Sequence, residues 1–210
     1  MDCESSWKKV IEIHNHTKRV FLWAEEMETI GFRDFVQPIN EHRHAWEHVV
    51  RARANELGLD AREPNTDYQE TNLNKALGHE YRAFFDSADW LAVIIREDIL
   101  KVLKPYSPKV IAAGFPDYYP TVRVRLDEIN QSIADKRMDK DIAAEMMLQS
   151  VEEYREVLDE LVEIRKTVYR QVPSLQDFRE ADRRSFLVEK IGLPVVIGIA
   201  VAVIAYNLLN

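Results

Sequence analysis

The feature that most constrains the fold is the stretch 191–209, IGLPVVIGIAVAVIAYNLL, which contains no charged residue. As an α-helix these 19 residues would extend for about 28 Å, close to the ~30 Å hydrocarbon core of a bilayer. A helix that is apolar on every side needs apolar surroundings on every side. We therefore expect 191–209 to be a transmembrane helix whose partner is the lipid bilayer.

Details of this stretch and its flank predict how the anchor would work. Pro194 lies in the first turn, where the missing N–H of proline is tolerated. Gly198, Ala202 and Ala205 form a face of small residues that would let two membrane helices approach closely. Lys and Arg residues precede the stretch, and the N-terminal residues show no signal peptide. We expect a single-pass membrane protein with its N-terminal domain in the cytoplasm.

The composition favours helices and argues against several classes of function. The chain has only 6 Gly, and a net charge of −8 is unfavourable for an extended nucleic-acid surface, so we predict no DNA partner. The single cysteine, Cys3, excludes an intramolecular disulfide and a cysteine-rich zinc site, and suits a reducing compartment. The sequence contains no Gly-rich phosphate loop and no supported Ser/His/Asp arrangement. We predict no cofactor and no metal ion.

The spacing of apolar residues predicts an all-α fold, an antiparallel helical bundle with a helical hairpin and the C-terminal transmembrane helix. The centre of the third expected helix, 83–95, is apolar almost all round, so we expect it to be the most enclosed. The expected helices cover 5–30, 39–57 with Gly58 at its C-terminal cap, 68–103, 121–136, 139–171 and 175–190. The expected parts are a bundle core at 1–120, a hairpin at 121–172, a charged juxtamembrane helix at 173–190 and the anchor at 191–209.

Two further apolar patterns bear on assembly. The helix over 139–171 carries a heptad seam that either packs within the hairpin against 121–136 or forms a coiled coil for self-association. The seam consists of Met147, Val151, Tyr154, Leu158, Leu161, Arg165 and Val168. The loop at 105–120 contains Phe115, Tyr118 and Tyr119, which we expect to cover the core.

A polar cluster is predicted on the second and third helices. The pattern A-x-x-H-x-x-R-A occurs at 45–52 and again at 76–83, and His and Arg three residues apart share one face of a helix. Two adjacent antiparallel helices would therefore bring the polar residues of both copies together. The residues of this predicted cluster are Glu41, His44, His48, Arg51, His79, Arg82 and Asp86.

Four interpretations of this cluster remain open. It is a buried polar layer whose members satisfy one another, a site for a small ligand, or a zinc or di-metal site built from Glu41, His44, His48 and His79. Against the metal interpretation, the Glu-x-x-His spacing occurs only once, and the nearby arginines would repel a cation. The fourth interpretation is phosphodiester chemistry, with His48 as general acid or base and Arg43 or Arg51 stabilising the developing charge.

The segment 43–48, RHAWEH, resembles the R-polar-x3-H motif of the HEPN superfamily. The resemblance implies a helical bundle that dimerises to form a composite cleft, with Arg43 and His48 as catalytic residues and His44 as the polar residue. We expect a membrane-anchored cytoplasmic interaction and sensing module that self-associates as a homo-oligomer, in a prokaryotic defence or stress system. The alternative is a tethered HEPN-like, metal-independent ribonuclease that cleaves RNA.

Overall fold

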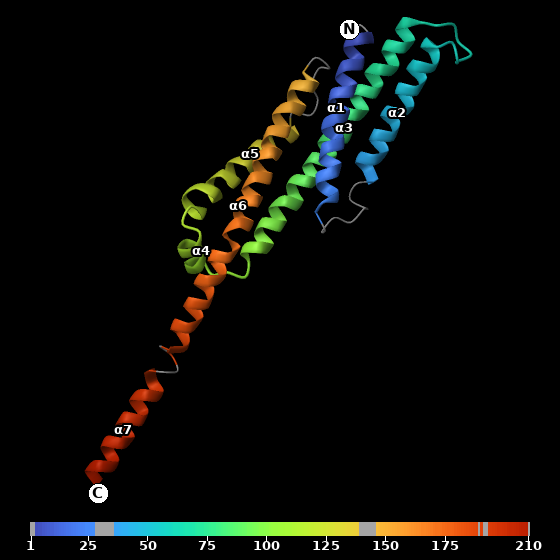
Figure 1. Cartoon of the computed structure of the whole chain (residues 1–210). Helices are drawn as coiled ribbons and strands as arrows, with labels where there is room; N and C mark the ends of the chain where they lie inside the picture. The colour runs from blue at the N-terminus through green and yellow to red at the C-terminus, as the bar shows by residue number, and fades with distance from the viewer. Residues whose placement is uncertain (1–2, 28–35, 139–145, 189, 191–192, 210) are drawn as a thin grey trace. The chain divides into compact units, whose positions relative to one another are not determined.

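The structure is a computed structural model that describes residues 3–27, 36–138, 146–188, 190 and 193–209. Every element in these ranges is helical, which confirms the all-α prediction (Figure 1). The elements are α1 (Cys3–Glu25), α2 (Val36–Glu56), α3 (Thr66–Leu103), α4 (Pro108–Gly114), the π-helical turn η2 (Tyr118–Val122), α5 (Arg123–Met138), α6 (Met147–Leu187) and α7 (Leu193–Leu209).

The ends of α2 follow from two residues that the sequence marks. Gly58 has a φ of 65°, a conformation that suits glycine, and its N–H donates to the Asn55 carbonyl at 3.1 Å. This confirms the predicted C-terminal cap. At the other end, α2 begins before the predicted start and includes Pro38 in its first turn, where no intrahelical donor is needed.

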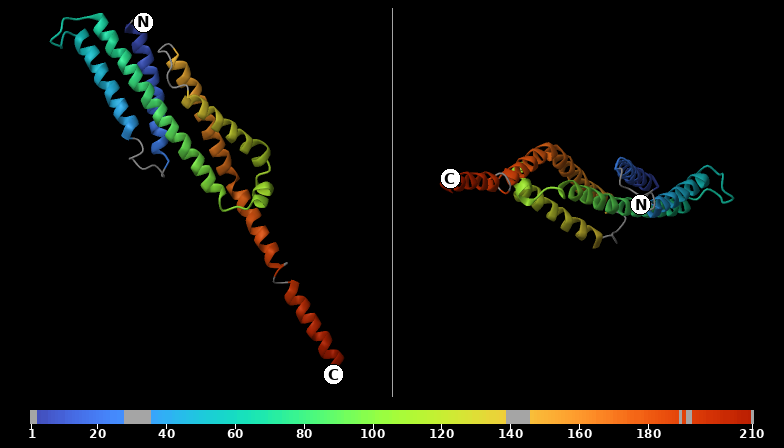
Figure 2. Two further views of the ribbon diagram at one scale, coloured as in Figure 1. Left: turned by 180° about the vertical axis from the view of Figure 1, so that it is seen from behind. Right: turned by 90° about the horizontal axis from the view of Figure 1, so that it is seen from below.

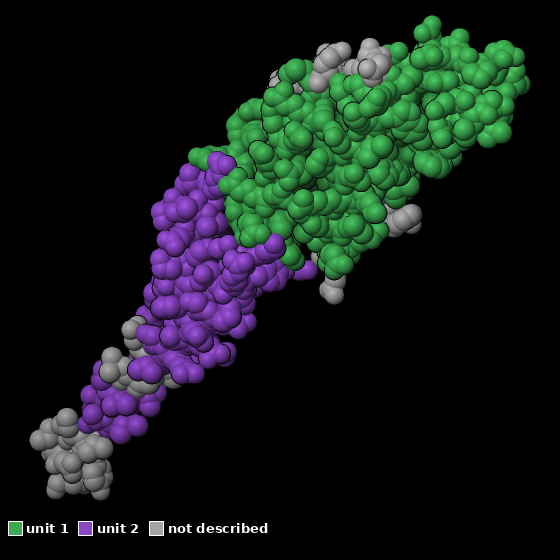
Figure 3. Space-filling model, turned by 45° about the horizontal axis from the view of Figure 1, so that its top comes forward, with its two compact units in different colours: residues 1–98, 126–165 green, residues 99–125, 166–210 purple. Residues whose placement is uncertain are grey.

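Contacts divide the chain into two compact units, which Figure 3 colours separately. Unit 1 comprises 1–98 and 126–165, and unit 2 comprises 99–125 and 166–210. All residues of the predicted polar cluster belong to unit 1, and the predicted anchor belongs to unit 2.

In unit 1 the other helices pack around α3, as the two views of Figure 2 also show. The first part of α3 contacts α1 and α2, and its later part contacts α5 and α6. Asp89 pairs with Tyr154 and, further along both helices, Asp98 pairs with Arg165, so α3 and α6 run in the same direction. Glu41 of α2 instead contacts His79 of α3, and the later residue His48 contacts the earlier residue Asn72. The helices α2 and α3 are therefore antiparallel.

The centre of α3 is enclosed as predicted. Phe84 and Phe85 are fully buried, and the Phe85 ring stacks on the Tyr154 ring with centroids 5.2 Å apart. The Tyr154 hydroxyl donates to Asp89 Oδ1 at 2.6 Å, and Arg137 Nε lies 3.1 Å from the same oxygen. An apolar core with one satisfied polar group therefore holds α3, α5 and α6 together.

The predicted heptad seam lies in unit 1 as far as Arg165, and its last residue, Val168, belongs to unit 2. Val151, Tyr154, Leu158 and Leu161 have no exposed surface, and Arg165 Nε lies 2.6 Å from Asp98 Oδ2. These seam residues are thus an intramolecular packing surface, and their contacts described here are with α3 rather than with the predicted partner 121–136.

Unit 2 differs from prediction in two places. The expected loop at 105–120 contains α4, which is capped by Ser107, and the turn η2. Phe115 and Tyr118 are buried, which confirms the prediction for these two residues, whereas Tyr119 is 38% exposed and does not cover the core. The second difference is that α6 continues through Pro173, where we predicted a break. The packing of the next turn explains this, because Leu175 is fully buried against Gly114.

The predicted transmembrane anchor is wrong. The helix α7 has 17 residues, which makes it about 26 Å long, and none of the helices in the described ranges is long and apolar enough to cross a bilayer. The predictions of a C-terminal transmembrane helix, a tail anchor and a single-pass membrane location are corrected accordingly. Pro194, Gly198 and Ala202 are exposed on α7, whereas residues 191 and 192 and the side chain of Ala205 lie outside the described residues.

Candidate functional site

Two doublets of an acid and a histidine face each other in unit 1. They are Glu41–His42 on α2 and His79–Glu80 on α3. Because the helices are antiparallel, Glu41 meets His79 and His42 meets Glu80, each with a closest N–O distance of 2.8 Å. Adjacent residues on a helix point about 100° apart. The two acid–histidine contacts therefore lie on different sides of the α2–α3 interface and form two separate clusters.

The first cluster, here called the polar layer, contains Glu41, His44, His48, His79 and Arg82. Arg82 Nε donates to Glu41 Oε2 at 2.8 Å. The rings of His48 and His79 are stacked with centroids 5.4 Å apart, and the His44 ring meets His79 edge-on. Burial alone would raise the pKa of Glu41, but hydrogen bonds from His79 and Arg82 lower it below its usual value.

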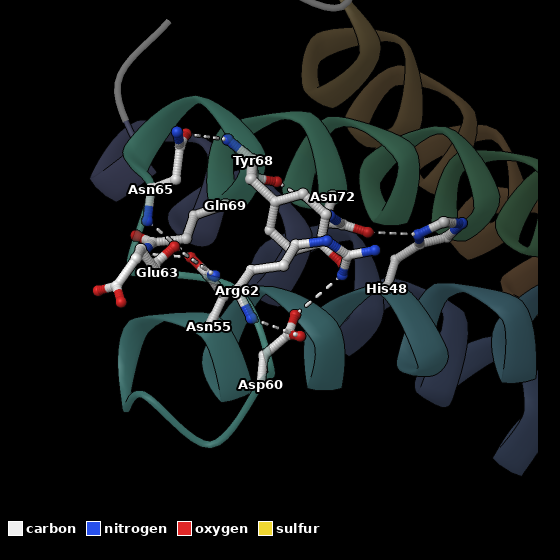
Figure 4. Close-up of polar contacts among 9 residues, drawn as sticks. All are labelled: His48, Asn55, Asp60, Arg62, Glu63, Asn65, Tyr68, Gln69 and Asn72. Carbon is white, nitrogen blue, oxygen red and sulfur yellow. Dashed lines mark hydrogen bonds and ion pairs between the residues drawn. The ribbon is translucent and has the colours of Figure 1, made fainter.

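The polar layer continues into a network at the α2–α3 connection (Figure 4). His48 Nδ1 lies 2.9 Å from Asn72 Oδ1, and the Asn72 amide donates to the Tyr68 carbonyl. The buried Asn55 accepts from the backbone N–H of Asn65 and from Gln69, and donates to the Glu63 carbonyl. These contacts are those of a mutually satisfied polar layer that fixes two helices, which was one of the interpretations open from the sequence.

The structure does not bring all the predicted site residues together. Arg43 is exposed, with Nη2 at 3.2 Å from His44 Nε2, whereas His48 faces Asn72. Arg51 pairs with Glu47 on an exposed face of α2. Asp86 lies further along α3 and lines a different pocket, which also contains Asp89 and Arg137.

The second cluster, here called the pocket site, consists of His14 on α1, His42 on α2 and Glu80 on α3. Glu80 is only 3% exposed. His14 Nδ1 and His42 Nδ1 approach its Oε1 at 3.5 and 2.8 Å. The other carboxylate oxygen, Oε2, is buried and has no hydrogen-bond partner among the described residues. Such an oxygen is costly and requires an explanation.

His42 Nδ1 is also buried, and its close contact is with Glu80 Oε1 at 2.8 Å. The contact with Glu80 raises the pKa of His42, although burial acts in the opposite direction. Burial by itself would raise the pKa of Glu80, but His14 and His42 lower it below its usual value.

The pocket site opens into a pocket of about 420 Å³ between α1 and α2. Apart from the three site residues, the lining is mostly apolar and includes two tryptophans, one of which, Trp46, is 64% exposed. The remaining lining residues are Trp7, Val10, Ile11, Arg43 and Val49. A concave apolar pocket with a few converging polar groups is the usual form of a small-ligand site.

The His42–Glu80 pair predicts how the stability of the ligand-free protein depends on pH. Since the pKa of His42 is raised, its contribution is complete below the unperturbed histidine value of 6.5 and is lost as the pH rises through the folded-state pKa. Since the pKa of Glu80 is lowered, its contribution is complete above 4.5 and is lost as the pH falls. We expect His42→Gln to destabilise the protein more at pH 5.5 than at pH 8.5, as measured by urea unfolding. Equal destabilisation at both pH values would contradict this prediction, and Glu47→Gln on the exposed face of α2 is the control.

Two groups of described residues have the geometry to hold a metal ion: the pocket site, and Glu41, His44 and His79 of the polar layer. The guanidinium group of Arg82 already donates to Glu41, the carboxylate that a metal ion would need, so a cation is unfavourable in the polar layer. In the pocket site, the ligand atoms lie within 4.8 Å of one another, and one buried carboxylate oxygen remains unpaired.

None of the three residues of the pocket site was among the predicted site residues, and the prediction of no metal ion did not take them into account. The available signal was the pair of dipeptides Glu41–His42 and His79–Glu80. When the two helices that carry them pack antiparallel, each glutamate lies opposite a histidine. His14 has no local motif, since it joins the site only through the packing of α1.

Comparison with protein-family models, curated proteins and solved structures found no match to this chain. The resemblance to the HEPN motif therefore stays a prediction.

Proposed function

We propose that this chain is a helical sensing module whose input is a divalent transition-metal ion bound at the pocket site. The observation that carries the proposal is the buried, unpaired Oε2 of Glu80 beside two imidazoles in an open pocket. The proposal keeps the sensing role expected from the sequence and assigns it a ligand. Self-association stays a prediction.

The ligand set matches the chemistry of borderline transition metals. Two histidines and one carboxylate bind Zn²⁺ or Fe²⁺ in many proteins and leave a coordination position open. A tetrahedral ion with bonds of about 2 Å requires ligand atoms about 3.3 Å apart. The distances of 2.8 and 3.5 Å from Glu80 Oε1 to the two histidine nitrogens bracket this value. The His14 and His42 rings are stacked with centroids 5.0 Å apart, so forming the site would also require one of these rings to turn until both nitrogens face the ion.

The origin of the ligands supports a sensing role. His14, His42 and Glu80 come from three different helices, so one bound ion would link α1 to the α2–α3 pair. A ligand that binds only the folded arrangement stabilises that arrangement in proportion to its occupancy. A bound ion would thus stabilise the packing of α1 on α2 and α3. A binding partner that recognises the packed form of α1 would respond to the metal.

Calorimetric titration of the untagged full chain with Zn²⁺ tests the proposal. We expect one strong site per chain, and we expect Glu80→Gln to weaken Zn²⁺ binding by at least about 100-fold. Loss of a second-shell partner alone costs 10- to 100-fold, and Glu80 is a direct ligand.

The matched control is Glu41→Gln, the same substitution in the neighbouring doublet of the polar layer. It should leave Zn²⁺ affinity within about threefold of wild type, because Glu41 is not a ligand in the pocket site. The proposal is wrong if wild type does not bind Zn²⁺, or if both variants bind it equally well.

A further inference from the structure

We infer that the open coordination position of the metal ion receives a small monocarboxylate with an apolar body. This inference rests on the metal site proposed above and names the organic ligand that completes it. The metal would bind the carboxylate head, and the pocket between α1 and α2 would hold the body.

The charge of the loaded site favours a monoanion. A divalent ion with two neutral imidazoles and the Glu80 carboxylate leaves one net positive charge. Glu80 is 3% exposed, so this charge would lie in surroundings of low dielectric constant. An unbalanced buried charge is costly. One carboxylate from the ligand would neutralise it, whereas an organic amine would add to it.

The pocket walls favour an apolar body. Trp7, Ile11 and Val49 line the pocket, and Trp46 lies in its exposed part. A volume of about 420 Å³ is at the small end of the range for ligand pockets. It accommodates one aromatic ring or a short branched chain, and aromatic walls bury such a group with favourable ring contacts.

The position of Arg43 also favours an organic ligand with a negative charge. Its side chain lines the pocket, and its Nη2 atom lies 3.2 Å from His44 Nε2, on the side of the polar layer. The guanidinium is therefore a second positive group near the pocket and disfavours organic cations. Arg43 thus has a place in this site as a charged wall residue.

The experiment uses the full chain loaded with Co²⁺, whose visible spectrum reports a change of ligand. Phenylacetate, acetate and phenethylamine are added separately. We expect phenylacetate to change the spectrum at a concentration about tenfold or more below that of acetate, because the ring is buried against the walls. Phenethylamine should leave the spectrum unchanged.

Trp46→Ala is the variant that distinguishes the contribution of the apolar pocket lining to ligand binding from the contribution of the metal ion. Trp46 is not a metal ligand, so Co²⁺ affinity should remain, while the preference for phenylacetate over acetate should fall by about tenfold. Equal affinities for phenylacetate and acetate in wild type, or no spectral change with either, would overturn this inference and leave the metal site standing. Failure to bind Co²⁺ would instead overturn the proposed metal site itself.

Discussion

Replacing Tyr154 with alanine should lower the free energy of unfolding by about 3–5 kcal/mol. The side chain has no exposed surface and contacts Phe84 and Phe85, so its removal leaves a cavity where α3 and α6 meet. The substitution also removes the hydroxyl that donates to Asp89. Burial raises the pKa of Tyr154, so this hydroxyl stays protonated as a donor. Urea unfolding followed by circular dichroism measures the change.

Two variants separate the parts of this effect. Tyr154→Phe keeps the ring and should cost about 1.5–3 kcal/mol, the range for a hydrogen bond to a charged group. Tyr169→Ala changes a tyrosine that is 43% exposed and should cost clearly less than Tyr154→Ala. If Tyr154→Ala were as stable as Tyr169→Ala, the described core around α3 would be wrong.

Zn²⁺ should raise the free energy of unfolding by about 4 kcal/mol when its free concentration is 1,000 times the dissociation constant. The reason is linkage, because the three ligands come together only when α1, α2 and α3 are packed. Thermal unfolding with Zn²⁺ and with a chelator measures this shift. Hydrogen exchange should show added protection of the α1 backbone around His14.

Substitutions of single residues show which part of the stabilisation by Zn²⁺ depends on α1. His14→Ala removes only the ligand on α1, so Zn²⁺ should protect α1 no more than the chelator does. Glu41→Gln should respond to Zn²⁺ as wild type does, because it changes the polar layer. Stabilisation of His14→Ala equal to that of wild type would show that Zn²⁺ acts elsewhere.

The helices were predictable from the sequence where local rules decide them. The apolar periodicity placed α3 to within two residues at its start, and Gly58 marked the end of α2. Local rules failed at Pro173, because the burial of Leu175 against Gly114 outweighs the lost backbone hydrogen bond. Local rules also failed for 191–209. The apolar composition predicted a transmembrane helix of 19 residues, whereas α7 has 17 residues.

The candidate site was predictable only in part. The repeated histidine pattern correctly placed His48, His79 and Arg82 at one helix interface. It missed Glu80, whose importance depends on its burial and on its unpaired oxygen. Both properties depend on the packing of α1 and α2 against α3, and no local spacing encodes the contact with α1.

The length of α3 gives the pocket site a mechanical connection to the rest of unit 1. Glu80 and Asp98 lie on one uninterrupted helix, and the sequence between them contains no proline or glycine. The distance along the axis is about 27 Å. A small rotation of the helix at Glu80 would reach the Asp98–Arg165 pair nearly undiminished, because no joint lies between them. Under the metal-site proposal, α3 would therefore transmit a movement at Glu80 to Arg165, which lies near the middle of α6.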